Sequence, residues 1–192
     1  SEPFWIAQDV YREVLIQAVR MYTYQRCGVE KSAAVVGTDW ADTPCHVAQQ
    51  QDTDCRFVQN PSSSTSRDLS GGWHDAGDYN KYMNYADGAV HDLLRAYEDQ
   101  PFVFTDDFGI PESGNGVPDL LDEVRWELEW MLKMQESDGS VHHKMGATDW
   151  SSGSPVSNDL AARRYAEPTA SATISACGSY AHAARIYSLI PS

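Results

Sequence analysis

The sequence predicts an all-α fold, on three observations. Apolar residues recur at helical spacing in four segments of four to six turns, and long polar loops join these segments. Almost no stretch alternates apolar and polar residues with the period of two that a half-buried strand requires. At 192 residues the chain is long enough to bury a core as one domain. We therefore expect helices packed on helices.

The first helix is expected from about residue 4 to residue 26, ending before Gly28, because glycine often follows the last turn of a helix. Residues 29–70 then break the helical pattern and have a loop composition. A loop of this length is usually functional or fastened to the rest of its domain. The apolar stripe of the first helix comprises Tyr11, Val14, Leu15, Ala18 and Tyr22.

Three further helices are expected at about residues 86–97, 118–135 and 168–189. The first of these ends before Pro101, and the next begins at Pro118, a favourable first-turn residue. A turn at residues 138–139 leads into a short extended piece at 140–145. The third helix of the chain carries Leu120, Leu121, Val124, Leu128, Met131 and Leu132 on its stripe, and Trp126 and Trp130 are expected to pack in the core. The stripe of the fourth comprises Ala170, Ile174, Cys177, Ala181 and Ala184.

Composition narrows the class of partner. The formal net charge is -14, from 28 acidic against 14 basic residues, which argues against nucleic acid or an anionic membrane surface. No run of about 18 apolar residues occurs, so no transmembrane helix is expected. The first five residues lack the basic and apolar regions of a signal peptide, so any such segment is expected to have been removed or not included.

The run Gly-Gly-Trp-His-Asp-Ala-Gly-Asp-Tyr-Asn-Lys-Tyr at residues 71–82 is the best candidate for chemistry. Its carboxylates, Asp75 and Asp78, lie three positions apart among glycines that permit tight turns. Aromatic side chains, which offer flat faces with polar edges, surround them. Paired carboxylates beside aromatic rings suit glycoside hydrolysis. A structural or calcium-binding acidic turn is the alternative, and composition alone favours it.

This run resembles the signature of glycoside hydrolase family 9, the inverting β-glucanases and cellulases. Two further stretches, residues 110–123 and 138–144, resemble later motifs of the family in the same order. The resemblance extends from about Phe4 to the end of the chain and covers about the first half of the family's catalytic module. It implies an (α/α)6 barrel, a double ring of helices, of which residues 1–192 form the N-terminal part of a single catalytic domain.

The resemblance also implies roles for the two acids. Asp78 matches the catalytic base, and Asp75 matches a residue that holds and polarises the attacking water. An inverting pair stands ~6.5–9.5 Å apart across the sugar, so these near neighbours in sequence are expected to share one side. The general acid is a Glu that the family places beyond the end of this chain. Glu112, Glu123 and Glu167 are candidates by residue type alone, and none is assigned.

Substrate contacts are expected from aromatic residues in loops and from a histidine pair. At most one of the neighbours His142 and His143 faces substrate, because adjacent residues of an extended piece point to opposite sides. The expected substrate-binding residues are Trp73, Tyr79, His142, His143 and Tyr165, with Tyr82 and Trp150 as further loop aromatics.

A metal site is predicted from Cys27, Cys45, His46 and His74, because two cysteines and two histidines form an ordinary tetrahedral zinc set. The resemblance supports this site, since zinc-bearing members of the family have the same Arg-Cys-Gly, Cys-His and Trp-His-Asp pattern. A closed set of four ligands would be structural. Cys55 leaves two alternatives: it replaces one of these ligands, or it forms a disulfide with Cys45 while His46 faces solvent. Calcium is a weaker candidate, with oxygen ligands from Asp106, Asp107, Glu112 and Asn115.

Taken together, these features predict hydrolysis of β-1,4-glucosidic bonds in cellulose or related β-glucans, with inversion, by a secreted or periplasmic enzyme. Two alternatives stay open: an exo-acting hydrolase of amino-sugar oligomers, and a non-catalytic remnant that binds sugar or has a structural role. Half of a helical ring leaves apolar helix faces with too few partners. We therefore expect that a second polypeptide supplies the missing helices, that the present helices repack, or that the chain self-associates.

Overall fold

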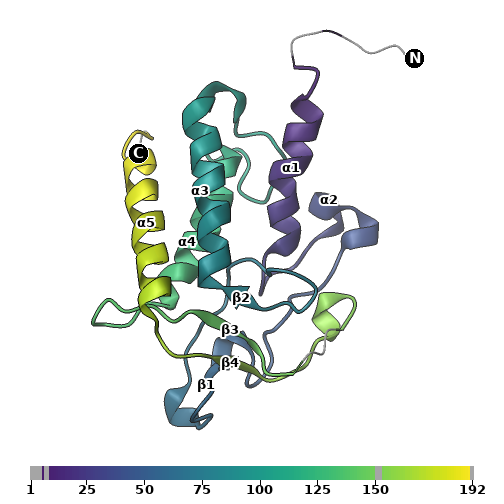
Figure 1. Ribbon diagram of the computed structural model, residues 1–192. Coiled ribbons are helices and arrows are strands. Elements are labelled where there is room, and N and C mark those ends of the chain that lie inside the picture. Colours follow the sequence, from purple (N-terminus) through teal and green to yellow (C-terminus); the bar gives the residue numbers. More distant parts are fainter. Residues whose placement is uncertain (1–5, 7–8, 150–152, 191–192) are drawn as a thin grey trace, which may run out of the picture.

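The computed structural model describes residue 6, residues 9–149 and residues 153–190 of the chain (Figure 1). Within these residues, four long helices stand side by side and a small sheet crosses one end of them. The helices are α1 (Arg12–Gln25), α3 (Met83–Asp99), α4 (Asp119–Lys133) and α5 (Ala170–Tyr187), with α2 (Ala33–Val36) as a single short turn. Single turns of 3-10 helix lie at Thr38–Trp40, Asp52–Asp54, Ser63–Thr65, Pro101–Val103 and Val156–Asn158.

All four predicted long helices are present, with shifted ends. The start expected near Phe4 lies outside the described residues, as does the loop aromatic Trp150. Within the described residues α1 begins only at Arg12, after a turn in which Asp9 has a φ of 61°. A positive φ cannot continue a right-handed helix, so the first helix is shorter than its apolar pattern suggests.

The four long helices alternate in direction along the chain. α1 and α3 each pack against the helix that comes two places later among these four. The chain enters α3 directly from a strand of the sheet and leaves α4 toward the same end. The sheet therefore lies at the N-terminal ends of α3 and α5 and at the C-terminal ends of α1 and α4 (Figure 1). α3 packs against α5 and α4, and α4 packs in turn against α1. None of the described helices is both long and apolar enough to cross a membrane.

The small sheet is the main departure from the all-α prediction. Its four strands, β1 (Arg56–Phe57), β2 (Lys81–Tyr82), β3 (Lys144–Ala147) and β4 (Arg163–Tyr165), are arranged in the order β1-β4-β3-β2. β1 and β4 are parallel, whereas β3 is antiparallel to both of its neighbours. Strands of two to four residues are too short to show a period of two, so periodicity could not reveal them. They position the loops that carry the site.

The core lies between the helices and extends under the sheet. From α4 the buried side chains include Leu120, Leu121, Val124 and Met131, and Trp130 is 1% exposed. On α5 the predicted stripe is wrong, because the residues that face α3 and the core are Ala172, Ala176, Ser179, Ala183 and Ile186. The stripe expected from the sequence, Ala170, Ile174, Cys177, Ala181 and Ala184, is exposed in the described part of the chain. α5 is apolar on two faces, and within the described residues only the face toward α3 and the core is covered.

Candidate active site and metal centre

The glycine-rich run at residues 71–82 lies closely against α4 and the C-terminal end of α1. Gly72 has a φ of 72°, and a Cβ on it would stand 2.6 Å from the ring of Trp130, so only glycine lets the backbone pass this close to α4. The carbonyl of Gly72 accepts hydrogen bonds from the Cys27 N–H at 2.9 Å and from the Trp126 Nε1–H at 3.0 Å. The His74 N–H donates to the carbonyl of Gln25 at 2.9 Å. These contacts attach the acidic turn to the end of α1.

Asp75 and Asp78 lie on one turn at the sheet end of the helices. The turn is closed by hydrogen bonds from the Asp75 N–H to the Asn80 carbonyl at 2.9 Å and from the Tyr79 N–H to the Ala76 carbonyl at 3.0 Å. Asp75 is exposed and Asp78 is half-buried. Desolvation raises the pKa of Asp75, and the negative charge of Asp78 raises it further. Two interacting carboxylates are therefore held on the same side, as the sequence predicts.

Three protein donors hold Asp78. Its Oδ1 accepts from the Asn80 backbone N–H at 3.1 Å, and its Oδ2 accepts from the Asn80 Nδ2 and from the Tyr82 hydroxyl, each at 2.9 Å. For the carboxylate of Asp75, by contrast, no protein donor lies within hydrogen-bond distance among the described residues. Asp78 thus has a defined orientation and Asp75 is free to bind water.

A cavity of about 290 Å³ adjoins the turn and is lined by residues of α1 and α3. Of the predicted substrate residues, Trp73 lines this cavity but is only 7% exposed, its ring 4.7 Å from that of Tyr22. Tyr82 lines it as well. Aromatic faces therefore accompany the acids, as expected.

The other predicted substrate residues have different surroundings. His142 is 3% exposed, donates from Nδ1 to the Ala166 carbonyl at 2.6 Å and lies 2.6 Å from Glu136 through Nε2. Tyr165 is 7% exposed and donates its hydroxyl to the Thr65 carbonyl at 2.9 Å. Both side chains are buried where the sheet pairs residues 145–147 with 163–165, and backbone hydrogen bonds continue this pairing to residues 143 and 167. His143 is half-buried, and the half-buried Tyr79 donates its hydroxyl to the Gly153 carbonyl at 2.8 Å.

The four predicted metal ligands converge. The ligand atoms of Cys27, Cys45, His46 and His74 all lie within 4.8 Å of one another, and all four residues are buried. Cys27 Sγ and His74 Nε2 lie 3.4 Å and 3.3 Å from His46 Nδ1, and Cys45 Sγ lies 3.9 Å from His74 Nε2. Around a tetrahedral zinc ion, two nitrogens stand about 3.4 Å apart and a nitrogen and a sulfur about 3.6 Å. The residues present therefore fit such an ion.

The surroundings of this cluster also suit a metal. His46 Nε2 lies 3.3 Å from Asp159, so the opposite ring nitrogen is the one that faces the cluster. Burial lowers the pKa of His74 to about 4, which keeps its imidazole neutral and able to bind a metal. The neighbouring thiol of Cys27 and the imidazoles of His46 and His74 hold the pKa of Cys45 far below its usual range.

The alternative disulfide is not formed. Cys45 and Cys55 are both free thiols, and His46, which that alternative places in solvent, is 2% exposed. Cys55 lies in the hydrophobic core, where burial raises its pKa to about 12. It is not part of the four-residue cluster.

A buried ion network connects the cluster to the acidic turn, and sequence reasoning missed it. Asp52 is 0% exposed. Its Oδ2 accepts a hydrogen bond from Lys81 Nζ at 2.7 Å and lies 3.1 Å from Cys27 Sγ. Its Oδ1 accepts a hydrogen bond from Arg163. Arg163 also donates to the Tyr79 carbonyl at 2.8 Å, next to Asp78. Lys81 stands inside the motif run and could have been noticed. Asp52 and Arg163 carry no local signal.

Comparison with known proteins identifies the family. The profile described as glycosyl hydrolase family 9 matches residues 11–192. The chain belongs to glycosyl hydrolase family 9. Endoglucanase C of Cellulomonas fimi is 37% identical over 207 residues, covering 97% of this chain and 19% of that protein.

Two solved structures of family 9 endoglucanases have a similar fold and align with 95% or more of this chain. A metagenome-derived family 9 endoglucanase superposes with a TM-score of 0.85 at 40% identity, covering 95% of this chain and 33% of that one. A Zn-binding triple mutant of the family 9 endoglucanase J30 superposes with a TM-score of 0.85 at 35% identity, covering 100% of this chain and 36% of that one. The chain thus spans about a fifth of the first relative and about a third of these two structures.

Two of the three glutamates considered for the general acid, Glu112 and Glu123, are paired with an arginine. Arg26 binds Glu112 through two hydrogen bonds of 2.8 Å and 2.9 Å and donates to Glu123 at 3.1 Å. Glu167 is exposed, and its backbone carbonyl accepts from His143.

The candidate calcium ligands have protein partners. Asp106 accepts from Gly114 and Gly116, Asp107 accepts from Arg12, and Asn115 forms hydrogen bonds with Asp122 and Val117. The structure therefore does not favour calcium.

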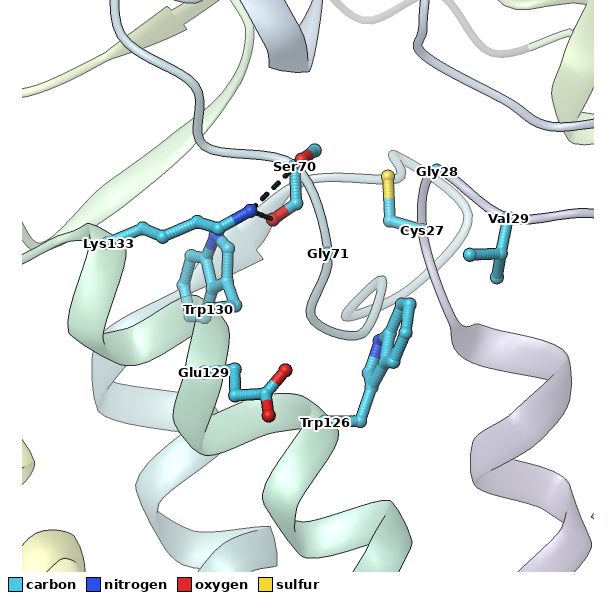
Figure 2. A pocket seen from close by; sticks show the side chains of 9 residues that line it. All are labelled: Cys27, Gly28, Val29, Ser70, Gly71, Trp126, Glu129, Trp130 and Lys133. Atoms are coloured by element: carbon cyan, nitrogen blue, oxygen red, sulfur yellow. Dashed lines mark hydrogen bonds between the residues drawn. The ribbon is translucent and has the colours of Figure 1, made fainter. Parts of the chain in front are cut away.

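A second pocket, of about 170 Å³, lies against α4 and contains neither acid of the turn. Figure 2 shows Lys133 reaching Ser70 there, where its Nζ donates to the carbonyl at 2.8 Å. Trp130 is in the core as predicted, and the half-buried Trp126 lies against Arg26, whose guanidinium carbon is 4.7 Å from the indole centroid. Packing therefore accounts for both tryptophans.

Proposed function

We propose that residues 1–192 are the N-terminal part of a single family 9 catalytic domain that hydrolyses β-1,4-glucosidic bonds in cellulose or related β-glucans with inversion. The observation that carries this proposal is the turn on which Asp78 is clamped by three donors while Asp75 stands open beside it. The endoglucanase names of its relatives support the substrate class.

In this proposal Asp78 removes a proton from water as the water oxygen attacks the anomeric carbon. Asp75 holds the same water, which its exposed carboxylate is free to do. The bond to the leaving oxygen breaks on the far side of the sugar, where a general acid protonates that oxygen. We assign this acid to a Glu outside the present sequence, because Glu112 and Glu123 are already paired with Arg26.

The complete domain is proposed to be an (α/α)6 barrel. The alternating helix directions and the pairing of α1 with α4 and of α3 with α5 are what a double ring requires. The remaining helices, on the same polypeptide or on a second one, would cover the exposed faces of α1 and α5. Since cellulose is a polymer too large to enter a cell, we place the enzyme outside the cytoplasm, secreted or periplasmic.

We propose zinc as the ion held by Cys27, Cys45, His46 and His74, in a structural role. Two thiols and two imidazoles leave no open coordination position, so a bound ion would stabilise the fold and take no part in the reaction. Its ligands come from the end of α1, from the loop at residues 45–46 and from the acidic turn. The support is the fit of these side chains and the Zn-binding variant among the similar structures.

The test is to assay the full-length protein that carries this chain on a soluble β-1,4-glucan and, in parallel, on amino-sugar oligomers. Early time points followed by NMR should show new α-anomeric reducing ends from the glucan, the product of inversion of a β-bond. Initial release of the β-anomer would exclude inversion. Cleavage of amino-sugar oligomers alone would assign the alternative substrate, and no hydrolysis of either would indicate a non-catalytic protein.

A further inference from the structure

The side chains around Asp78 form a closed set of donors with a fixed direction. Asn80 Oδ1 accepts the Ala147 N–H at 3.0 Å, which orients the carboxamide so that its Nδ2 points toward Asp78 and Tyr82. The carboxamide cannot turn over without losing this bond and placing its oxygen against a carboxylate. Asn80 is buried, so solvent does not compete for these contacts.

Among the described residues, the hydrogen of the Tyr82 hydroxyl has one protein acceptor within hydrogen-bond distance. Asn80 Nδ2, at 3.0 Å, donates to the Tyr82 oxygen, and Lys144 Nζ lies 3.5 Å from the same atom. Neither group can accept a hydrogen bond. The hydroxyl must therefore direct its own hydrogen to Asp78 Oδ2, 2.9 Å away. Lys144 lies opposite Tyr82 in the pairing of β2 with β3, so the sheet itself sets this arrangement.

The two oxygens of Asp78 are consequently unequal. Among the described residues, Oδ2 accepts two side-chain hydrogen bonds, whereas Oδ1 accepts only the backbone N–H of Asn80 at 3.1 Å. A carboxylate oxygen has two acceptor sites, so Oδ1 keeps one for water while Oδ2 is saturated.

We infer that Tyr82 and Asn80 are positioning residues for Asp78 in the hydrolysis proposed above. They clamp Oδ2 and leave Oδ1 as the oxygen that takes the proton from water. This inference rests on the proposed function, in which Asp78 is the base. The ring of Tyr82 packs beside the cavity, but its hydroxyl acts through Asp78 rather than on the sugar.

The first experiment compares Tyr82→Phe with the unmodified full-length protein on soluble β-glucan. Phenylalanine keeps the ring and removes the clamping hydroxyl, so kcat should fall about 10–100-fold with KM little changed, as for a misplaced catalytic group. Asn80→Ala should behave similarly. The control is Tyr24→Phe, which loses a hydroxyl bond to the Val36 carbonyl at 3.4 Å and none to Asp78, so kcat should be unchanged. Circular dichroism and a melting curve check that each variant is folded.

The second experiment asks whether Tyr82 acts through Asp78. In an Asp78→Ala background, azide can attack the anomeric carbon directly and needs no base, so Tyr82→Phe should cause no further loss of the azide-supported rate. An equal loss in that background would show that Tyr82 acts on the substrate and would overturn the inference. A raised KM with unchanged kcat would do the same.

The two proposals fail differently. If the unmodified protein does not hydrolyse glucan, the proposed function is wrong and the positioning role is lost with it. If the protein is active, Asp78→Ala is inactive and Tyr82→Phe keeps the full kcat, only the positioning role is wrong.

Discussion

At the scale of single residues, Asp52 is the charged group on which the contacts of the site converge. Burial alone would raise the pKa of Asp52, but the charges of Arg163 and Lys81 hold it well below its usual range. An unpaired buried carboxylate would cost several kcal/mol, on the order of the whole stability of a domain. Lys81 also donates to the carbonyls of Leu69 and Gly71, so the same pair of charges fixes the glycine-rich run.

The two acids of the turn should differ in kinetic importance. In the full-length enzyme, Asp78→Ala should lower kcat by about 10²–10⁴-fold, the usual contribution of a general base, while substrate binding survives. Asp75→Ala should cost less, because its role is to hold the water. Steady-state kinetics and a binding isotherm for an oligosaccharide measure both. Near-normal turnover without Asp78 would contradict the assignment.

Gly146 should tolerate no side chain. A Cβ at this position would stand 1.7 Å from Asn80 Oδ1, so Gly146→Ala must displace the carboxamide that orients Asp78. We expect a loss of about 1–3 kcal/mol in the free energy of unfolding, as for overpacking, together with a lower kcat. The matched control is Gly88→Ala in α3, where a Cβ meets nothing within 4 Å and should stabilise the helix by about 0.5–1 kcal/mol. Urea unfolding of both variants measures these changes. A Gly146→Ala variant as stable as the unmodified protein would refute the prediction.

At the scale of elements, α4 carries a buried carboxyl group that forms no direct ion pair within the described part of the chain. Glu127 is 0% exposed and accepts the Trp73 N–H at 2.7 Å. Desolvation raises the pKa of Glu127 to about 8. It therefore stays protonated in the folded protein at a pH where the unfolded chain has already released this proton.

Stability should accordingly fall with rising pH on account of Glu127. Below its ordinary pKa of 4.5 both states hold the proton, and between 4.5 and about 8 only the folded state does, so the loss reaches up to about 3 kcal/mol at pH 7. Glu127→Gln, which keeps an acceptor for the Trp73 N–H, should be more stable than the unmodified protein at pH 7 and similar to it at pH 4.5. Urea unfolding across this range measures the difference, and parallel curves for the two proteins would contradict it.

The metal cluster joins three elements, and its removal should loosen all three. The unmodified protein should hold about one equivalent of zinc, and Cys45→Ser or His74→Ala should lose it together with several degrees of Tm. The controls are Cys55→Ala, a buried thiol outside the cluster, and Cys177→Ser, an exposed one. Elemental analysis after purification without added metal is the measurement. Loss of zinc from Cys55→Ala with retention in Cys45→Ser would reassign the ligand.

At the scale of the whole molecule, apolar helix faces stand open on both flanks. Tyr11 and Val14 of the first flank are 77% and 65% exposed, and Ile174 on α5 is 72% exposed. Apolar surface of this kind usually marks an interface. The lengths of the similar endoglucanases point to the remaining helices of the domain as its cover.

The 192-residue chain alone should therefore be inactive and prone to self-association. It should hydrolyse soluble β-glucan only after addition of a fragment that spans the rest of the proposed domain, because we propose that the general acid lies in that fragment. Ile174→Asp should make the isolated chain more monodisperse in light scattering while lowering the Tm of the full-length protein. Strong hydrolysis by the chain alone would place the acid within it and refute the half-domain proposal.

Much of this site could be predicted because its signals are local. His74, Asp75 and Asp78 lie within five positions of one run, and the four metal ligands are of residue types that rarely cluster without reason. Helix periodicity likewise needs only neighbouring residues, so the four long helices were predicted, with every end except the start of α1 within three residues.

The remaining features needed the folded chain. Asp52 pairs with Arg163, which lies 111 positions away in the sequence. Tyr165 and His142 are buried by the pairing of β3 with β4. No pattern of neighbouring residues indicates either fact. The choice between the two apolar faces of α5 was also open, because hydrophobicity says that a face can be buried but not which neighbour will cover it. Residue type and spacing thus specify the chemistry that a segment can perform. Which side chains reach the reacting carboxylate depends on the packing of segments distant in sequence.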